Sequence, residues 1–186
     1  NNAGMGMRLI SEEFQNNPPC FWEAGTEPVH AIMETNLLGP FQMARPAVPH
    51  MLEGGWGRII NVTTSIVTMQ RGGMYPYGPA KAGLEASSRG WAEDLADTGV
   101  TVNILIPGGA VATDMVPDSN RETMEAAPGV ALLEADVMAT PILWLASTAS
   151  DGITGMRFVA AQWDASLDGD EAAKKAMAPA GFDGRT

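Results

Sequence analysis

The chain alternates between long stretches with helical apolar spacing and short runs that are rich in β-branched residues. Apolar residues recur every three or four positions over 26–53 and 76–97, which predicts two amphipathic helices. Runs rich in β-branched residues at 58–64 and 101–106 predict buried strands, the first of them after a Gly-rich turn. Strands that alternate with helices in this way are typical of an α/β domain with a parallel sheet.

The second half of the chain continues this alternation. Its pattern predicts a helix, a strand and a terminal helix at 134–147, 155–160 and 168–177. We expect one domain over 1–178 and a frayed tail at 179–186, because chain ends without apolar periodicity are usually poorly ordered. The length of 186 residues suits a single domain, and no internal repeat is visible.

Two segments lack periodicity and predict irregular structure. Residues 5–25 are interrupted by an Asn-Asn-Pro-Pro run, and residues 114–133 are polar and rich in Pro and Met, with a short helical patch at 121–126. At the start of the first helix, Thr26 fits the N-cap position. Within that helix, Pro46 predicts a kink or a break.

Composition narrows the possible classes of function. The net charge of −11 argues against nucleic acid or an anionic membrane surface as a partner, because binding to phosphates needs a basic face. Cys20 is the single cysteine, so an internal disulfide is impossible and a reducing cytoplasm is the expected compartment. His30 and His50 have no metal-ligand spacing, so no metal site is expected.

The most informative chemistry lies in Tyr77-Gly78-Pro79-Ala80-Lys81, at the start of a predicted helix. Residues four apart share a helix face, so we expect Lys81 close enough to Tyr77 to favour phenolate over phenol. A free phenol titrates near ~10, which is too high for proton transfer near neutrality. The pair therefore predicts an acid–base tyrosine, with an ordinary Tyr and Lys on a helix surface as the alternative.

Several further motifs surround this pair. They are Asn1-Asn2-Ala3-Gly4, Thr35-Asn36-Leu37-Leu38-Gly39, the run from Gly57 to Ser65, Val102 to Gly108, Val111 to Met115, Leu143 to Ser147 and Ile153-Thr154-Gly155. In this order and spacing, the chain resembles the classical short-chain dehydrogenase/reductase family over nearly its whole length. The resemblance implies part of a Rossmann-type, doubly wound parallel sheet and a NAD or NADP cofactor.

The resemblance also implies a missing part. Members of the family begin with a strand, a Gly-rich turn and a helix whose N-terminus binds the pyrophosphate. This chain opens on the Asn-Asn-Ala-Gly motif, which follows the fourth strand in the family. We therefore expect that about the first third of the domain is absent and that the chain alone is inactive. The residue that selects NAD or NADP would lie in that third.

By resemblance, the reaction is a reversible hydride transfer between a nicotinamide cofactor and a small carbonyl or secondary alcohol. Tyr77 would exchange a proton with the substrate oxygen, and Lys81 would polarise Tyr77 and contact the nicotinamide ribose. Asn36 would hold a water molecule that links Lys81 to solvent. The segment 114–133 would be a lid over the substrate.

A hydroxyl that orients the substrate oxygen has two candidates. Thr64 lies 13 residues before Tyr77, where the family usually has a serine. Ser65 is the rival, because consecutive side chains on a strand point to opposite faces and only one can face the substrate. Simple capping at the strand end remains a third interpretation.

Further positions would contact the cofactor, again by resemblance. They are Asn2, Ala3 and Gly4 beside the adenosine ribose, and Pro107, Gly108, Val111 and Thr113 beside the nicotinamide amide and the diphosphate. Gly109-Ala110 carries one residue more than the usual spacing, which leaves the register of this loop open.

The resemblance further implies a homodimer or homotetramer built through the helices 26–53 and 76–97. Apolar residues such as Met43, Leu84 and Trp91 are expected on their outward faces. The alternative function is a non-catalytic binding or regulatory subunit of the same fold, suggested by Thr64 and by an unusual C-terminal sequence. An epimerase or dehydratase of the extended branch agrees less well with the opening motif.

Overall fold

A computed structural model describes residues 1–117 and 132–182 of the protein. In these residues, one sheet has the strand order β1 (Gly57–Val62), β2 (Val100–Ile106), β3 (Met156–Val159) and β4 (Met177–Pro179). The pairs β1–β2 and β2–β3 are parallel, and β3–β4 is antiparallel. The predicted α/β class with a mainly parallel sheet is therefore confirmed.

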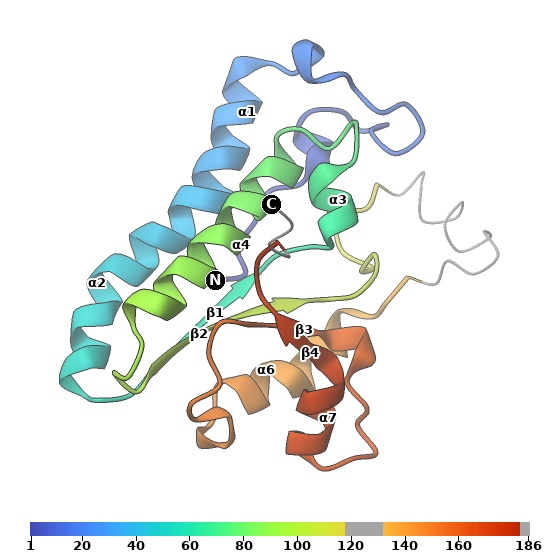
Figure 1. Ribbon diagram of the computed structural model, residues 1–186. Helices are drawn as coiled ribbons and strands as arrows, with labels where there is room; N and C mark the ends of the chain where they lie inside the picture. The colour runs from blue at the N-terminus through green and yellow to red at the C-terminus, as the bar shows by residue number, and fades with distance from the viewer. Residues whose placement is uncertain (118–131, 183–186) are drawn as a thin grey trace.

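Helices cover both faces of the sheet (Figure 1). On one side lie α1 (Thr26–Met33), α2 (Gly39–Glu53) and α4 (Tyr77–Asp94), and on the other lie α6 (Ala139–Leu145) and α7 (Gly169–Ala176). The short helix α3 (Ile66–Gln70) connects β1 to α4. Single 3₁₀ turns lie at Met7–Leu9, Phe21–Glu23, Ala135–Met138, Thr148–Ser150 and Ala160–Gln162.

Each face of the sheet carries a hydrophobic cluster, and a third cluster in the described residues contains Met7, Phe14 and Met74. Val102 of β2 packs with Ala92 and Leu95 near α4, whereas Leu105 packs with buried residues of α6 and α7. All of β2 is buried, as expected for a central parallel strand covered on both faces. This double coverage explains why all seven residues are buried, the polar Thr101 and Asn103 included.

The first predicted helix forms, with two corrections. Its helical residues begin at Thr26, so the N-cap is Gly25, and no side chain caps this end. The helix also runs through Pro46 without a break, because Pro46 is exposed and the carbonyl that it leaves unpaired can bond to water. The irregularity lies earlier, at the π-helical turn η3 (Glu34–Leu38), which joins α1 to α2.

The end of the chain differs from the expected frayed tail. Residues 177–179 form β4, and the next two amides donate to Gly155 O and to the Glu85 carboxylate. A single sequence gives no sign of this, because a three-residue strand is too short to show a period. The expected helical patch at 121–126 and most of the expected lid lie outside the described residues.

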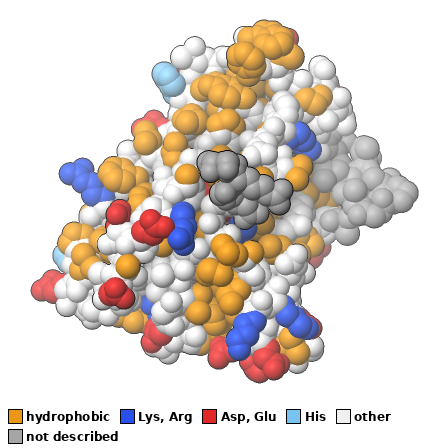
Figure 2. Space-filling view, in the orientation of Figure 1, with side chains coloured by type: hydrophobic (Ala, Val, Ile, Leu, Met, Phe, Trp, Pro, Cys, Tyr) orange, Lys and Arg blue, Asp and Glu red, His pale blue; other side chains and the backbone are white. Residues whose placement is uncertain are grey.

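The apolar surface also differs from the prediction. Leu84 is 1% exposed and belongs to the core, and Trp91 is half-buried, whereas Met43 on α2 is 66% exposed. Figure 2 shows hydrophobic side chains gathered at the end of the molecule that carries the segment before α1. Phe21 and Trp22, 65% and 71% exposed, belong to that segment. In the described residues, no helix is long and apolar enough to cross a membrane.

Candidate active site

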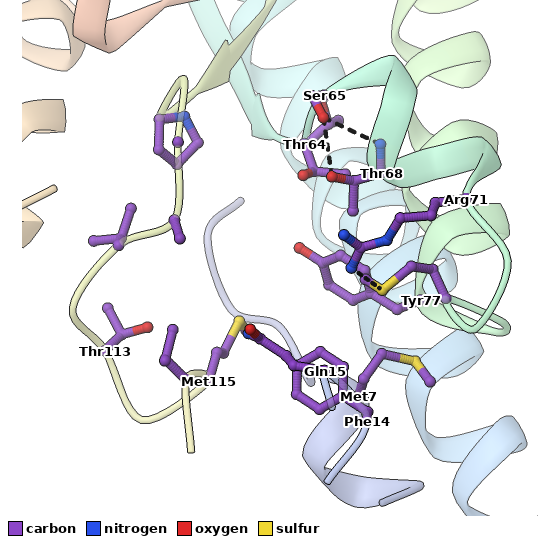
Figure 3. A pocket seen from close by; sticks show the side chains of 18 of the residues that line it. Met7, Phe14, Gln15, Thr64, Ser65, Thr68, Arg71, Tyr77, Thr113 and Met115 are labelled. Atoms are coloured by element: carbon purple, nitrogen blue, oxygen red, sulfur yellow. Dashed lines mark hydrogen bonds between the residues drawn. The ribbon is translucent and has the colours of Figure 1, made fainter. Parts of the chain in front are cut away.

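A cavity of about 360 Å³ opens where β1 and β2 end and α4 begins. Tyr77 and the hydroxyl residues that follow β1 line one wall, and the loop 107–113 lines the other (Figure 3). Ligands of open parallel sheets bind outside the carboxyl ends of the strands, which is where this cavity lies. The fold therefore brings Tyr77 and the expected nicotinamide loop to opposite sides of one space.

Tyr77 is the first residue of α4 and is mostly buried. Burial raises the pKa of its phenol above the ordinary value, and hydrogen bonding with the Thr64 side chain opposes the increase. The expected net lowering of the Tyr77 pKa is therefore wrong for this structure. Lys81 Nζ lies 5.9 Å from the centre of the Tyr77 ring, and desolvation of the phenol dominates.

Lys81 is 4% exposed and lies one helical turn behind Tyr77. Its ammonium donates to the carbonyl oxygen of Val62 at 2.8 Å and forms no ion pair with the described residues. Burial lowers the pKa of Lys81 from 10.5 to about 8. A buried cation without a carboxylate partner is costly for the fold, and such groups are frequent at functional sites.

Asn36 lies in the π-helical turn η3 and is fully buried. Its carboxamide pairs with the backbone of Met5, accepting from the amide and donating to the carbonyl, both at 2.8 Å. A Cβ on Gly4 would stand 3.2 Å from Asn36 Oδ1 and 3.7 Å from Lys81 Nζ, so the Gly4 backbone passes close to both. Asn36 thus holds the segment around Gly4 and Met5 beside Lys81, at a π-turn of the kind common near functional sites.

Thr64 and Ser65 have different surroundings. Ser65 is the N-cap of α3, where its hydroxyl accepts from the Thr68 amide at 3.1 Å and shares a 2.9 Å hydrogen bond with the Thr68 hydroxyl. The Thr64 side chain instead lies toward Tyr77, where hydrogen bonding with it lowers the pKa of the phenol against the larger effect of burial. Both residues line the cavity, but only Ser65 is already committed to a helix end.

The expected cofactor contacts fall into two groups. Residues that line the cavity are Pro107, Gly108, Val111 and Thr113. Asn2, Ala3 and Gly4 do not line it. They follow Asn1, which runs along the free edge of β1, accepting from Val62 N at 3.0 Å and donating through its side chain to Asn61 at 2.7 Å.

The cavity also contains residues that the sequence analysis missed. The irregular segment 5–25 supplies Met7, Phe14 and Gln15, and the stretch between β1 and α4 supplies Thr68, Arg71 and Met74. The first group has no periodic signal. The second could have been found, because a serine before an apolar pair is a typical helix start, and a helix here brings Arg71 back toward Tyr77.

A second buried polar cluster lies one turn further along α4. Glu85 is fully buried, and its carboxylate accepts from Thr63 Oγ1 and Arg157 Nε, each at 2.9 Å, and from Gly181 N at 3.0 Å. It forms an ion pair with Arg157 of β3. Charged helix residues usually face solvent, so a single sequence gives no reason to place Glu85 inside.

Comparison with known proteins agrees with this site. A family model described as enoyl-(acyl carrier protein) reductase matches residues 2–161. The acetoacetyl-CoA reductase of Cupriavidus necator is 32% identical over 164 residues, which cover 85% of this chain and 61% of the relative. The 3-oxoacyl-[acyl-carrier-protein] reductase FabG of Vibrio cholerae is 36% identical, with 83% and 61% covered.

Solved structures agree as well. A gluconate 5-dehydrogenase from Burkholderia cenocepacia, in complex with NADP and tartrate, matches with a TM-score of 0.69 and 25% identity over 85% of this chain and 60% of its own. A 3-oxoacyl-[acyl-carrier protein] reductase from Brucella melitensis matches with a TM-score of 0.68 and 28% identity over 86% of this chain and 59% of its own. The chain therefore spans about 60% of the length of such relatives.

Proposed function

Since the chain belongs to the short-chain dehydrogenase/reductase family, we propose that the protein containing it transfers a hydride between NAD or NADP and a small carbonyl or secondary alcohol. The observation that supports this most is the mostly buried phenol of Tyr77 on the cavity wall, with Thr64 beside it and Lys81, which has no ion pair with the described residues, behind it. These are a proton donor, a hydroxyl and a cation at one place.

The residues present fit the nicotinamide end of such a cofactor. The cavity separates Tyr77 from the loop with Pro107, Val111 and Thr113, which would hold the nicotinamide. When bound, the cofactor supplies or accepts the hydride. Lys81 would reach its ribose, and the hydroxyl of Thr113 would contact the diphosphate.

In the reducing direction, Tyr77 gives its proton to the carbonyl oxygen while the carbonyl carbon gains a hydride, so a ketone becomes a secondary alcohol. The raised pKa keeps Tyr77 protonated before the reaction, as a donor must be. The tyrosinate that forms is stabilised by the nearby Lys81 charge, and Thr64 orients the substrate oxygen. Regeneration of Tyr77 takes one proton from solvent.

We also propose the cytoplasm as the compartment and a homodimer or homotetramer as the assembly. Apolar side chains of the π-turn and α2 support self-association, since Leu38, Phe41 and Met43 are 49%, 47% and 66% exposed. The names of the curated relatives point to 3-oxoacyl thioesters, and those of the solved structures also include a gluconate dehydrogenase.

Replacing Tyr77 by Phe tests the proposal in the whole protein. We expect turnover with NADPH or NADH to fall by about 10²- to 10⁴-fold, because the proton donor is lost, while cofactor binding followed by nicotinamide fluorescence persists. Tyr75→Phe is the matched control, since Tyr75 is 41% exposed and outside the cavity lining. Turnover of Tyr77→Phe within a few fold of the wild type would refute the assignment. A wild type that binds cofactor but turns over no carbonyl would favour the non-catalytic alternative.

A further inference from the structure

Arg71 is the only Asp, Glu, Lys, Arg or His among the residues that line the cavity within the described parts of the chain. Within the described residues, its guanidinium makes one hydrogen bond, from Nη2 to Met74 Sδ at 3.3 Å, and a thioether sulfur is a weak acceptor. It forms no ion pair with any described carboxylate. Arg45 and Lys174 also have no ion pair with the described residues, so what distinguishes Arg71 is its place on the cavity wall.

Local structure places this arginine relative to Tyr77. Helix α3 begins after Ser65 and ends at Gln70, so Arg71 follows directly and its carbonyl accepts from Met74 N. The next turn passes through Gly73, whose φ of +77° suits glycine. In Figure 3 the guanidinium extends from the same wall as the Tyr77 phenol, toward the cavity.

The packing of α3 against α4 holds this spacing. A Cβ on Gly78 would stand 2.6 Å from the Met69 carbonyl oxygen and 3.0 Å from that of Thr68, so only glycine allows the two helices to approach this closely. Gly78 immediately follows Tyr77 in the first turn of α4. The end of α3, and Arg71 with it, is therefore seated directly on the turn that presents the catalytic phenol.

We propose that Arg71 binds a carboxylate of the substrate, so that the substrate is an oxo acid or the corresponding hydroxy acid. This rests on the proposed function. A guanidinium offers two parallel N–H donors that match a carboxylate, and the remaining lining is neutral, so an anionic group finds its complement only at Arg71 within the described wall. The cavity of about 360 Å³ must also admit a nicotinamide ring, so the space that remains favours a small acid over a bulky one.

In this arrangement the two ends of the substrate have separate partners. The carboxylate lies at Arg71, and the carbonyl oxygen lies at Tyr77 and Thr64. Reduction adds one hydride to the carbonyl carbon and the Tyr77 proton to the oxygen, and the carboxylate is unchanged. Arg71 is thus a residue that determines specificity without taking part in proton transfer.

The experiment compares acids with their own methyl esters in the whole protein. The substrates are acetoacetate, 2-oxobutanoate and 4-oxopentanoate, each beside its ester, with NADPH or NADH as reductant. We expect the wild type to prefer at least one acid over its ester by about 10-fold or more. Arg71→Gln should lower kcat/KM for that acid by about 10- to 100-fold, mainly through KM, and leave the ester within about threefold. For Arg71→Lys, kcat/KM for the acid should lie between the values of the wild type and Arg71→Gln, because lysine keeps the charge but lacks the two parallel N–H donors of the guanidinium.

Arg89→Gln is the control, since Arg89 is paired with Glu93 on the surface of α4. An acid-to-ester ratio that Arg71→Gln does not change would overturn the inference. Esters or acyl thioesters turned over without the acids would overturn it too, while the proposed function would stand. If the wild type reduces none of them, the proposed function fails, and calorimetric titration with malonate decides the Arg71 site. Binding that Arg71→Gln abolishes would support the site, and absence of binding to the wild type would overturn it.

Discussion

Lys81 and Glu85 are buried charged residues one helical turn apart on α4, and their surroundings differ sharply. The carboxylate of Glu85 has hydrogen bonds from Thr63, Arg157 and Gly181, so its charge is both paired and fully bonded. The ammonium of Lys81 donates one hydrogen bond, to the Val62 carbonyl, and forms no ion pair with a carboxylate of the described residues. The same face of α4 thus carries one charge that is paired, Glu85, and one charge, Lys81, that has no ion-pair partner among the described residues.

The difference follows from position along the sheet. Glu85 lies deeper, where Thr63 after β1, Arg157 of β3 and Gly181 after β4 each supply one partner. Lys81 lies nearer the strand ends, behind Tyr77 at the cavity. A charge that is neutralised by its neighbours stabilises a fold, whereas one that is left unneutralised stays available for a ligand or for a developing negative charge. We therefore regard Glu85 as structural and Lys81 as functional.

Removing Glu85 should give the largest change in stability. We expect Glu85→Ala to lower the free energy of unfolding by about 3–5 kcal/mol, because Arg157 is left as a buried charge without its partner. Chemical denaturation of the whole protein measures this. The double variant Glu85→Leu with Arg157→Met should recover most of the loss, since an apolar pair needs no compensation. Equal instability of the single and the double variant would contradict this account.

Removing the Lys81 charge should raise the free energy of unfolding, whereas removing Glu85 lowers it. Burial lowers the pKa of Lys81 from 10.5 to about 8, so below pH 8 the folded state must hold a charge that is better hydrated when unfolded. Between pH 8 and 10.5 the unfolded chain binds the proton and the folded chain does not, so wild-type stability rises with pH. We expect Lys81→Met to be more stable at pH 7 by about 1–3 kcal/mol, less than the full shift because the bond to Val62 is lost.

That advantage of Lys81→Met should shrink by pH 10, and turnover should be lost at either pH. Denaturation at both pH values measures the stability difference. A difference that does not depend on pH would mean that the buried charge is not its cause.

The two hydroxyls after β1 extend the comparison on a smaller scale. Thr64→Val keeps the shape and removes the hydrogen bond near Tyr77, so we expect kcat/KM to fall by about 10- to 100-fold with little change in stability. Steady-state kinetics of the whole protein checks this. An effect within about twofold would remove Thr64 from the site.

Ser65→Ala should behave in the reverse way. It removes the N-cap of α3, so we expect a loss of about 1 kcal/mol in stability and activity within about threefold. Thermal denaturation beside the same kinetic assay separates the two effects. A greater loss of activity in Ser65→Ala than in Thr64→Val would move the orienting role to Ser65.

Much of the fold was predictable because it depends on local periodicity. The predicted helix 76–97 appears as Tyr77–Asp94, and the predicted strand 101–106 appears as Val100–Ile106. Both were predictable because a period of 3.6 and a run rich in β-branched residues reflect the local backbone geometry. The short elements α3 and β4 were missed. Five and three residues are too few to establish a period.

The sequence by itself determined the α/β class and the placement of Tyr77 one turn before Lys81, since helix geometry alone puts residues four apart on one face. Only the tertiary structure decided the electrostatics of that face. The pKa of Tyr77 rises rather than falls. Among the residues that the structure describes, Lys81 has no carboxylate partner, while Glu85 is paired with Arg157. The partners of Glu85 come from positions 63, 157 and 181, and desolvation depends on what covers each group. Neither the partners of a buried charge nor the degree of its desolvation can therefore be derived from the neighbouring sequence.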